Sequence, residues 1–166
     1  MNSIKGKVLI LGDNIDTDQI LPGYAMAEPF NQLGKFAMAG CPELDFAHRA
    51  QGGDILVAGC NFGCGSSREQ APIALKMAGV SLVVAVNFAR IFRRNAINIG
   101  LPVYVADIVK LVHNGELIEV DMVNGMIHWA GKTIKTPPLS PGVLKTLDYG
   151  GLIPQVRAEL SQESKK

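Results

Sequence analysis

Three short apolar runs, separated by segments of helix length, restrict most strongly what this chain can fold into. The runs are DILVAG (54–59), SLVVAV (81–86) and PVYVA (102–106). Their length and their flanking glycine, proline and polar residues are typical of buried strands. The segments between them, REQAPIALKMAG and ARIFRRNAINIG, are predicted helices that end at Gly79 and Gly100. Strands joined by helices through short links predict parallel strands with right-handed crossovers.

The segments on either side of these runs complete the predicted fold. KVLIL (7–11) is a short apolar strand, and residues 116–136 alternate as a β-hairpin around the Asn-Gly turn in VNG. Residues 140–160 are predicted to be helical in two pieces, and SQESKK (161–166) is a frayed tail. The sequence therefore predicts an α/β fold, in one domain over residues 1–166. This domain has a parallel βαβαβ part and an added antiparallel β portion.

Composition excludes several classes of protein. The 166 residues are 48% hydrophobic and 19% charged, as in globular proteins that bury one core. A formal net charge of +1 argues against a nucleic-acid-binding face, and no apolar run approaches the roughly 20 residues of a membrane span. The N-terminus has no signal-peptide layout. The three cysteines are accordingly expected to be reduced thiols in a cytoplasmic protein.

The loop GCNFGCGSSREQ (59–70) carries the least ordinary chemistry in the chain. It contains no lysine, so it is not a Walker loop, and Arg68 stands where a dinucleotide fingerprint needs its third glycine. Cys60 and Cys64 are separated by three residues, with Cys41 distant, which matches no familiar zinc or iron–sulfur spacing. Small buried thiols are the better interpretation of these cysteines.

The same loop has the features of an anion site. A strand, a glycine-rich turn and a helix in succession would place the backbone amides of Ser66–Arg68 at a helix N-terminus, which favours an anion. The Arg68 guanidinium adds a two-pronged donor that matches a carboxylate. Gly63 and Gly65 would let the backbone approach a ligand closely. A capping box formed by Ser66 and Glu69 needs no ligand and is the structural alternative; the two can coexist.

Three blocks together resemble a known family. GDNIDTDQILPG, GCNFGCGSSREQAP and FARIFRRNAINIGLP, in this order, are similar to the small subunit of 3-isopropylmalate dehydratase, in the aconitase superfamily. The resemblance extends from Gly6 to about Pro154. It implies a swivelling β/β/α domain and reversible elimination and re-addition of water on a hydroxy di- or tricarboxylate. It also implies a [4Fe–4S] cluster held by a separate large subunit, with no metal bound by this chain.

The resemblance also implies roles for single residues. Ser66 would be the catalytic base, which takes a proton from the carbon next to a carboxylate. Ser67 and Arg68 would bind a substrate carboxylate. Asp18, in DNIDTDQI, corresponds to the active-site aspartate of the superfamily and would support the base or the substrate.

Other charged residues are predicted to have no catalytic role. Asp13 and Asp16 are interpreted mainly as turn residues in an Asx-rich segment. Arg90, Arg93 and Arg94 lie on one predicted helix and are interpreted as surface or interface charges.

The loop PGYAMAEPF is the predicted determinant of substrate choice. Tyr24 is followed by Ala25, Met26 and Ala27, where an arginine would suit a substrate with an additional carboxylate. This apolar run favours an alkyl group, and thus isopropylmalate over citrate or homocitrate. Core packing is the alternative for the large apolar residues of this loop, and it is the preferred interpretation of Phe30.

Alternatives remain open at this stage. Gln70 stands where the family usually has a histidine, and glutamine forms hydrogen bonds but cannot titrate. Homoaconitase, dimethylmalate and citramalate dehydratases have related small subunits. A non-catalytic anion-binding domain of the same fold is the alternative from another class, and a cluster-bearing large subunit would distinguish it from an enzyme subunit.

Overall fold

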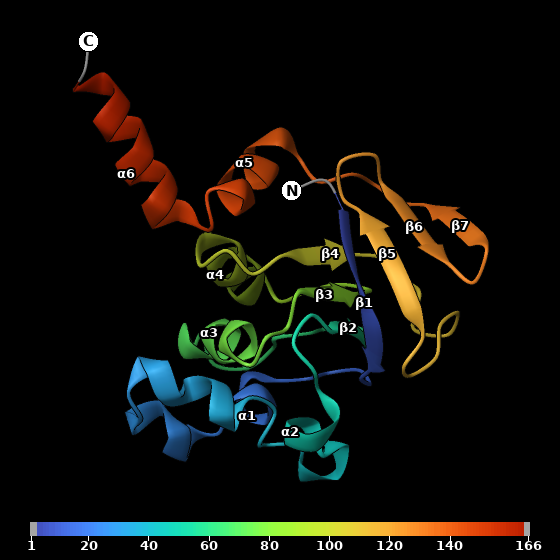
Figure 1. Ribbon diagram of the computed structural model, residues 1–166. Helices are drawn as coiled ribbons and strands as arrows, with labels where there is room; N and C mark the ends of the chain where they lie inside the picture. The colour runs from blue at the N-terminus through green and yellow to red at the C-terminus, as the bar shows by residue number, and fades with distance from the viewer. Residues whose placement is uncertain (1–2, 165–166) are drawn as a thin grey trace.

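The computed structural model describes residues 3–164 and contains one seven-stranded sheet (Figure 1). The strands lie in the order β4-β3-β2-β1-β5-β6-β7. The four strands from β1 to β4 pair in parallel, whereas β5 pairs antiparallel with β1 and continues into β6 and β7. Their bounds are β1 Ser3–Ile10, β2 Ile55–Ala58, β3 Leu82–Ala85, β4 Val103–Val105, β5 Leu117–Asp121, β6 Met126–Trp129 and β7 Lys132–Lys135.

Helices connect the parallel strands and follow the last one. They are α1 Thr17–Ile20, α2 Phe46–Arg49, α3 Gln70–Met77, α4 Arg90–Asn98, α5 Pro141–Asp148 and α6 Leu152–Glu163, with 3-10 turns at η1 Gly23–Ala27, η2 Phe30–Phe36 and η3 Pro42–Leu44. The predicted βαβαβ part with an added antiparallel portion is confirmed, as are the two C-terminal helices. None of the helices in the described range is long and apolar enough to cross a membrane.

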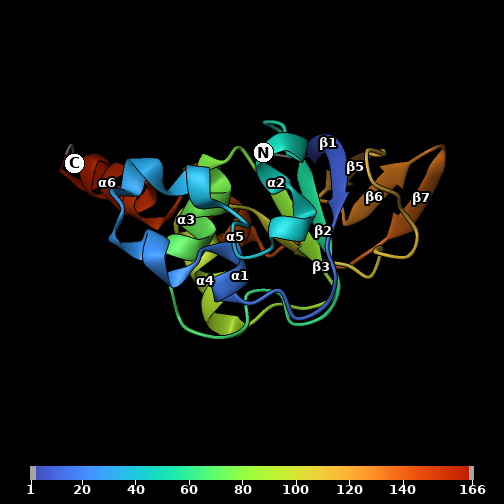
Figure 2. The same ribbon diagram turned by 90° about the horizontal axis from the view of Figure 1, so that it is seen from below.

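The parallel strands are covered on both faces. Along β2, Leu56 and Ala58 belong to the apolar cluster that includes α3 and α4, because side chains alternate between the two faces of a strand. Ile55 and Val57 point to the other face and pack in a second cluster with residues of β5 and β6. The layers are therefore helices, parallel strands and antiparallel strands, as Figures 1 and 2 show. Burial of β2 on both faces explains its continuous apolar run.

Two details of the prediction are wrong. Residues 126–136 form two strands, because Ala130 and Gly131 both have positive φ angles, of 45° and 74°, and reverse the chain in a two-residue hairpin turn. The tail does not fray at residue 161, since α6 continues to Glu163. Residues 165–166 of the predicted tail lie outside the described range.

The carboxyl ends of β1, β2 and β3 lie at one edge of the sheet, and their loops are tied together there. The Asp13 carboxylate accepts a hydrogen bond from the Cys60 backbone amide at 2.7 Å. Asn61 donates from its side chain to the Asn14 side chain at 2.9 Å, and from its backbone amide to the Asn87 side chain at 2.8 Å. Parallel strands bring these three loops together although they are distant in the sequence, and this edge contains the candidate site.

Candidate active site

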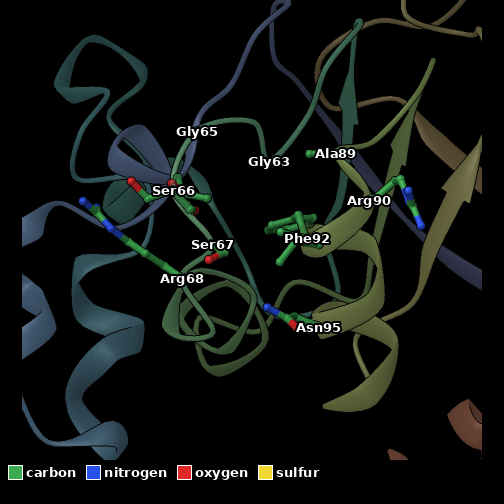
Figure 3. Close-up of a pocket in the computed structure, with 11 residues that line it drawn as sticks. Gly63, Gly65, Ser66, Ser67, Arg68, Ala89, Arg90, Phe92 and Asn95 are labelled. Atoms are coloured by element: carbon green, nitrogen blue, oxygen red, sulfur yellow. Dashed lines mark hydrogen bonds between the residues drawn. The ribbon is translucent and has the colours of Figure 1, made fainter.

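A cavity of about 360 Å³ opens where the loop after β2 faces the start of α4 (Figure 3). Its wall combines backbone of the glycine-rich loop with polar side chains and the Phe92 ring. The lining residues are Thr17, Gly63, Gly65, Ser66, Ser67, Arg68, Ala89, Arg90, Ile91, Phe92 and Asn95. Three of the predicted site residues, Ser66, Ser67 and Arg68, therefore share one cavity.

Two glycines give the loop its course. Gly63 and Gly65 have φ angles of 78° and 92°, a left-handed conformation that L side chains rarely adopt. A Cβ atom on Gly63 would also collide with the ring of Phe92. Phe92 packs edge to face on Phe62, with ring centroids 5.3 Å apart, so the loop is held against a rigid aromatic group.

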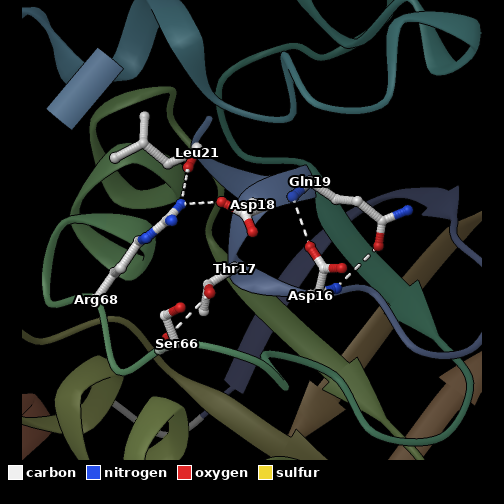
Figure 4. Close-up of polar contacts among 7 residues, drawn as sticks. All are labelled: Asp16, Thr17, Asp18, Gln19, Leu21, Ser66 and Arg68. Carbon is white, nitrogen blue, oxygen red and sulfur yellow. Dashed lines mark hydrogen bonds and ion pairs between the residues drawn. The ribbon is translucent and has the colours of Figure 1, made fainter. Parts of the chain in front are cut away.

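The loop after β1 supports Ser66 through its backbone carbonyl (Figure 4). The buried Thr17 donates its hydroxyl to the Ser66 carbonyl at 2.9 Å, and its amide donates to the Cys64 carbonyl at 2.9 Å. Thr17 begins α1, whose N-cap is Asp16 in a reciprocal capping box with Gln19. Asp16, predicted as a turn residue, is therefore the cap of this helix. The cap fixes the position of Thr17 next to the Ser66 carbonyl.

Arg68 is held by the same segment. Its Nη1 atom forms an ion pair with Asp18 and donates a hydrogen bond to the Leu21 carbonyl at 3.0 Å (Figure 4). The Arg68 side chain is 16% exposed, whereas that of Asp18 is 64% exposed. Within residues 3–164, Nε and Nη2 of Arg68 have no hydrogen-bond partner. The guanidinium is therefore oriented by the protein and retains donors for a ligand carboxylate.

Ser66 and Ser67 are exposed and free to bind a ligand. Neither hydroxyl, and neither backbone amide, donates a hydrogen bond to another residue of the described chain. The prediction that the amides of Ser66–Arg68 lie at a helix N-terminus is wrong, because α3 begins at Gln70 with Glu69 as its N-cap. The alternative, a capping box of Ser66 and Glu69, is not formed either, since the N-cap has no side-chain hydrogen bond. The serine amides consequently lie in the loop before the helix, not in its first turn. Unpaired amides in a glycine-rich turn still favour an anion.

The predicted specificity loop lies next to this region but outside the cavity wall. Tyr24 and Met26 are 69% and 37% exposed, whereas Ala25 is fully buried within η1. Ala27 is exposed at the end of the same 3-10 turn. Phe30 is 60% exposed, so its predicted core packing is wrong. A role of this loop in substrate choice stays a prediction.

Sequence reasoning missed five lining residues of the cavity and gave Arg90 no role in it; the five are Thr17, Ala89, Ile91, Phe92 and Asn95. Thr17 lies between Asp16 and Asp18, and its own residue type gives no signal of a site. Its contact with Ser66 spans 49 sequence positions. Phe92 and Asn95 lie one helical turn apart on α4, a spacing that places both on one helix face. The spacing could have identified Phe92 and Asn95 as a pair. It does not indicate which face of the helix meets the loop that carries Ser66.

The thiols of this chain do not assemble a metal site. Cys41 is buried, and burial raises the pKa of its thiol above the ordinary value. Cys60 and Cys64 are half-buried in the loop after β2. Among residues 3–164, no three cysteine, histidine or acidic side chains lie together as a metal-binding group. The residues present therefore do not fit an iron–sulfur cluster, which needs several thiolates at one point.

Comparison with known proteins agrees with this arrangement. A family model for the aconitase C-terminal domain matches residues 14–107. The 3-isopropylmalate dehydratase small subunit of Caldicellulosiruptor bescii is 47% identical over 96% of this chain and 98% of its own length. The homoaconitase small subunit of Methanothermobacter thermautotrophicus is 47% identical over 90% of this chain and 88% of its own.

A solved structure extends the agreement to the whole fold. The crystal structure of 3-isopropylmalate dehydratase from Methanocaldococcus jannaschii has a TM-score of 0.90 to this chain, with 40% sequence identity. The match covers 99% of both chains, so it includes the antiparallel strands and the C-terminal helices that lie beyond the family model. On these grounds the chain belongs to the family of aconitase C-terminal domains.

Proposed function

We propose that this chain is the small subunit of a hydro-lyase that isomerises a hydroxy dicarboxylate by dehydration and rehydration, with 2-isopropylmalate as its substrate. This is the dehydratase step of leucine biosynthesis. The observation that carries the proposal is the cavity in which Ser66 and Ser67, with free hydroxyls and unpaired amides, lie beside the oriented Arg68. The name and the 98% coverage of the Caldicellulosiruptor bescii relative support this reaction and substrate. The homoaconitase relative supports the type of reaction and leaves homocitrate as the alternative substrate.

The residues of this chain supply binding and proton transfer. Arg68 binds a substrate carboxylate through its remaining donors, and the Ser67 hydroxyl and amide bind the same anion. This places the carbon next to the carboxylate at the Ser66 oxygen, which takes its proton as the hydroxyl of the neighbouring carbon leaves. A serine hydroxyl is a poor base, so the alkoxide depends on nearby positive charge from Arg68 and the loop amides.

In this proposal Asp18 orients Arg68. Its carboxylate pairs with Arg68 from the exposed side, while the Leu21 carbonyl binds the same Nη1 atom. Two acceptors on one nitrogen fix the guanidinium plane, because rotation would break both contacts. Asp18 is thus a positioning residue, which acts on the substrate through Arg68.

A large subunit completes the enzyme. Residues 3–164 contain no group of cysteine, histidine and acidic side chains that could hold an iron–sulfur cluster. In this proposal the [4Fe–4S] cluster expected of the superfamily is held by the partner. The cavity is open on the face where Ser66 and Ser67 are exposed, and the partner would cover it there.

Reconstitution tests the proposal. The purified chain is expected to be colourless and inactive, and turnover of 2-isopropylmalate should appear when a cluster-loaded large subunit is added anaerobically. Dehydration is followed by the ultraviolet absorbance of the unsaturated intermediate, with homocitrate, citramalate and dimethylmalate assayed beside it. An iron–sulfur absorption band in the chain alone would contradict the two-subunit arrangement. A higher kcat/KM for homocitrate than for 2-isopropylmalate would make homocitrate the substrate, while the proposed dehydration and rehydration would stand.

A further inference from the structure

The arginines of α4 are placed where they do not stabilise the chain itself. Arg90, Arg93 and Arg94 are exposed and occupy the N-terminal half of the helix, which has no acidic residue in its first turn. A helix N-terminus carries partial positive charge and disfavours cations. Arg90 also faces Arg93 and Arg94 at spacings of three and four residues, where like charges repel. Helix stability therefore does not explain these three charges.

The three arginines also lack partners within the part of the chain that the structure describes. None of them forms an ion pair or a side-chain hydrogen bond there. By contrast, Arg68 is paired with Asp18, and Arg49 donates to the Leu44 carbonyl. Arg157 on α6 also has no side-chain partner in the described range, so the distinguishing feature of α4 is that three unpaired arginines lie together on one helix.

A second hollow, of about 490 Å³, lies along these arginines and adjoins the active-site cavity. All three arginines line it, together with apolar and amide groups of α4 and α5, which are Ile91, Ile97, Asn98 and Val143. Arg90 and Ile91 line both hollows, and Ile91 is 45% exposed. A protein chain that covers the active-site cavity would therefore also meet the arginine face, defined as Arg90, Ile91, Arg93 and Arg94.

We propose that the arginine face binds an acidic segment of the large subunit and thereby holds that subunit over the active-site cavity. This inference rests on the proposed function, which requires a large subunit at this face. Covering three guanidinium groups without carboxylates would leave buried unpaired charges, which is strongly unfavourable. Aspartate and glutamate side chains form two-pronged bonds with guanidinium groups and would also relieve the repulsion within α4.

Charge reversal on α4 tests the proposal. The variant R93E/R94E leaves Arg90 in place, because Arg90 also lines the active-site cavity. The control variant K132E/K135E reverses two exposed charges on β7 and changes the net charge of the chain equally. Both are mixed with the cluster-loaded large subunit of the same organism. Sedimentation gives the dissociation constant, and turnover at saturating large subunit gives kcat.

The expected result separates the two variants. R93E/R94E should weaken the complex by at least about tenfold and leave kcat at saturation near wild type. K132E/K135E should leave both the dissociation constant and kcat near wild type. The wild-type dissociation constant should rise with ionic strength, more steeply than that of R93E/R94E. The neutral variant R93Q/R94Q should lie between wild type and R93E/R94E. Reversing an acidic residue of the large subunit to arginine should restore binding to R93E/R94E.

Two outcomes would overturn the proposal. One is a complex of R93E/R94E as tight as that of wild type, and the other is equal weakening by the β7 control. Failure of the proposed function looks different, since the wild-type subunits would then associate without turning over any of the hydroxy acids. Absence of any wild-type complex would contradict both.

Discussion

The parallel part of the molecule, β1 to β4 with its helices, contains the whole candidate site, whereas the C-terminal part, β5 to β7 with α5 and α6, contains none of it. Both parts contribute strands to one sheet, and both bury apolar residues. The difference lies in the connections. Parallel strands need crossovers, which return every strand end to the same edge, so loops from distant sequence positions meet there. Hairpins join strands that follow each other in the sequence, so they do not bring loops from distant sequence positions together.

The C-terminal part has a structural task instead. Ile118, Val120 and Ile127 of β5 and β6 cover the second face of the parallel strands, against Ile55 and Val57. Without that cover the β2 strand, apolar on both faces, would be exposed on one of them. The comparison therefore predicts that equivalent substitutions affect turnover in the parallel part and only stability in the C-terminal part.

The largest expected contrast is between two serines. Ser66→Ala should lower kcat of the reconstituted enzyme by about 10³-fold or more, because it removes the proposed base. Ser140→Ala, at the N-cap of α5, should leave kcat unchanged and lower the free energy of unfolding by about 1 kcal/mol, because the Ser140 hydroxyl accepts a hydrogen bond from the Val143 amide. Steady-state kinetics and urea unfolding of both variants provide the measurement. Retained turnover in Ser66→Ala would remove its role as the base.

Two glycines with similar φ angles give the next contrast. Gly63→Ala should destabilise the fold by about 3 kcal/mol, because the left-handed backbone is strained by a side chain and the new Cβ meets the Phe92 ring. Gly115→Ala, before β5, has the same backbone strain but open space around the new atom, and should cost about 1 kcal/mol. Urea unfolding compares the two. Equal losses would mean that the Phe92 contact adds nothing.

A conservative change of arginine should have a smaller, kinetic effect. Arg68→Lys should raise KM about 10- to 100-fold with a smaller effect on kcat, because lysine cannot contact Asp18, Leu21 and a substrate carboxylate with one planar group. Arg157→Lys on the exposed face of α6 is the matched control and should leave KM unchanged. A wild-type KM in Arg68→Lys would show that this guanidinium does not bind the substrate.

The smallest expected effect concerns substrate choice. Met26→Arg and Ala27→Arg should raise the ratio of kcat/KM for homocitrate to that for isopropylmalate by about tenfold, because a carboxylate would gain a partner near η1. Ala25 is unsuitable for this test, since a buried arginine would disrupt η1. Val123→Arg, exposed after β5, is the control in the C-terminal part. An unchanged ratio in both variants would exclude this loop from substrate selection.

The sequence alone did not predict α1, α2 or the turn between β6 and β7. It did predict the order of the other strands and helices and the loop that carries the candidate site. Both of these predictions depend on local information. Short apolar runs specify buried strands, and an unusual chemical group lies within the six positions of Gly63, Gly65, Ser66, Ser67 and Arg68. The helix ends at Gly79 and Gly100 were likewise local, since both glycines have the positive φ of a helix terminus.

Only the tertiary structure decided how that loop is supported. The Thr17 bond to Ser66, the contacts of Arg68 with Asp18 and Leu21, and the burial of Ala25 all depend on which loops meet at the sheet edge. The start of α3 at Gln70, two residues after Arg68, was likewise not predicted from the sequence. Sequence periodicity reports which face of an element is buried, but not which distant residue lies against it. The crossovers between the parallel strands decide which residues meet, and they bring the proposed base Ser66, the supporting Thr17 and the start of α4 together.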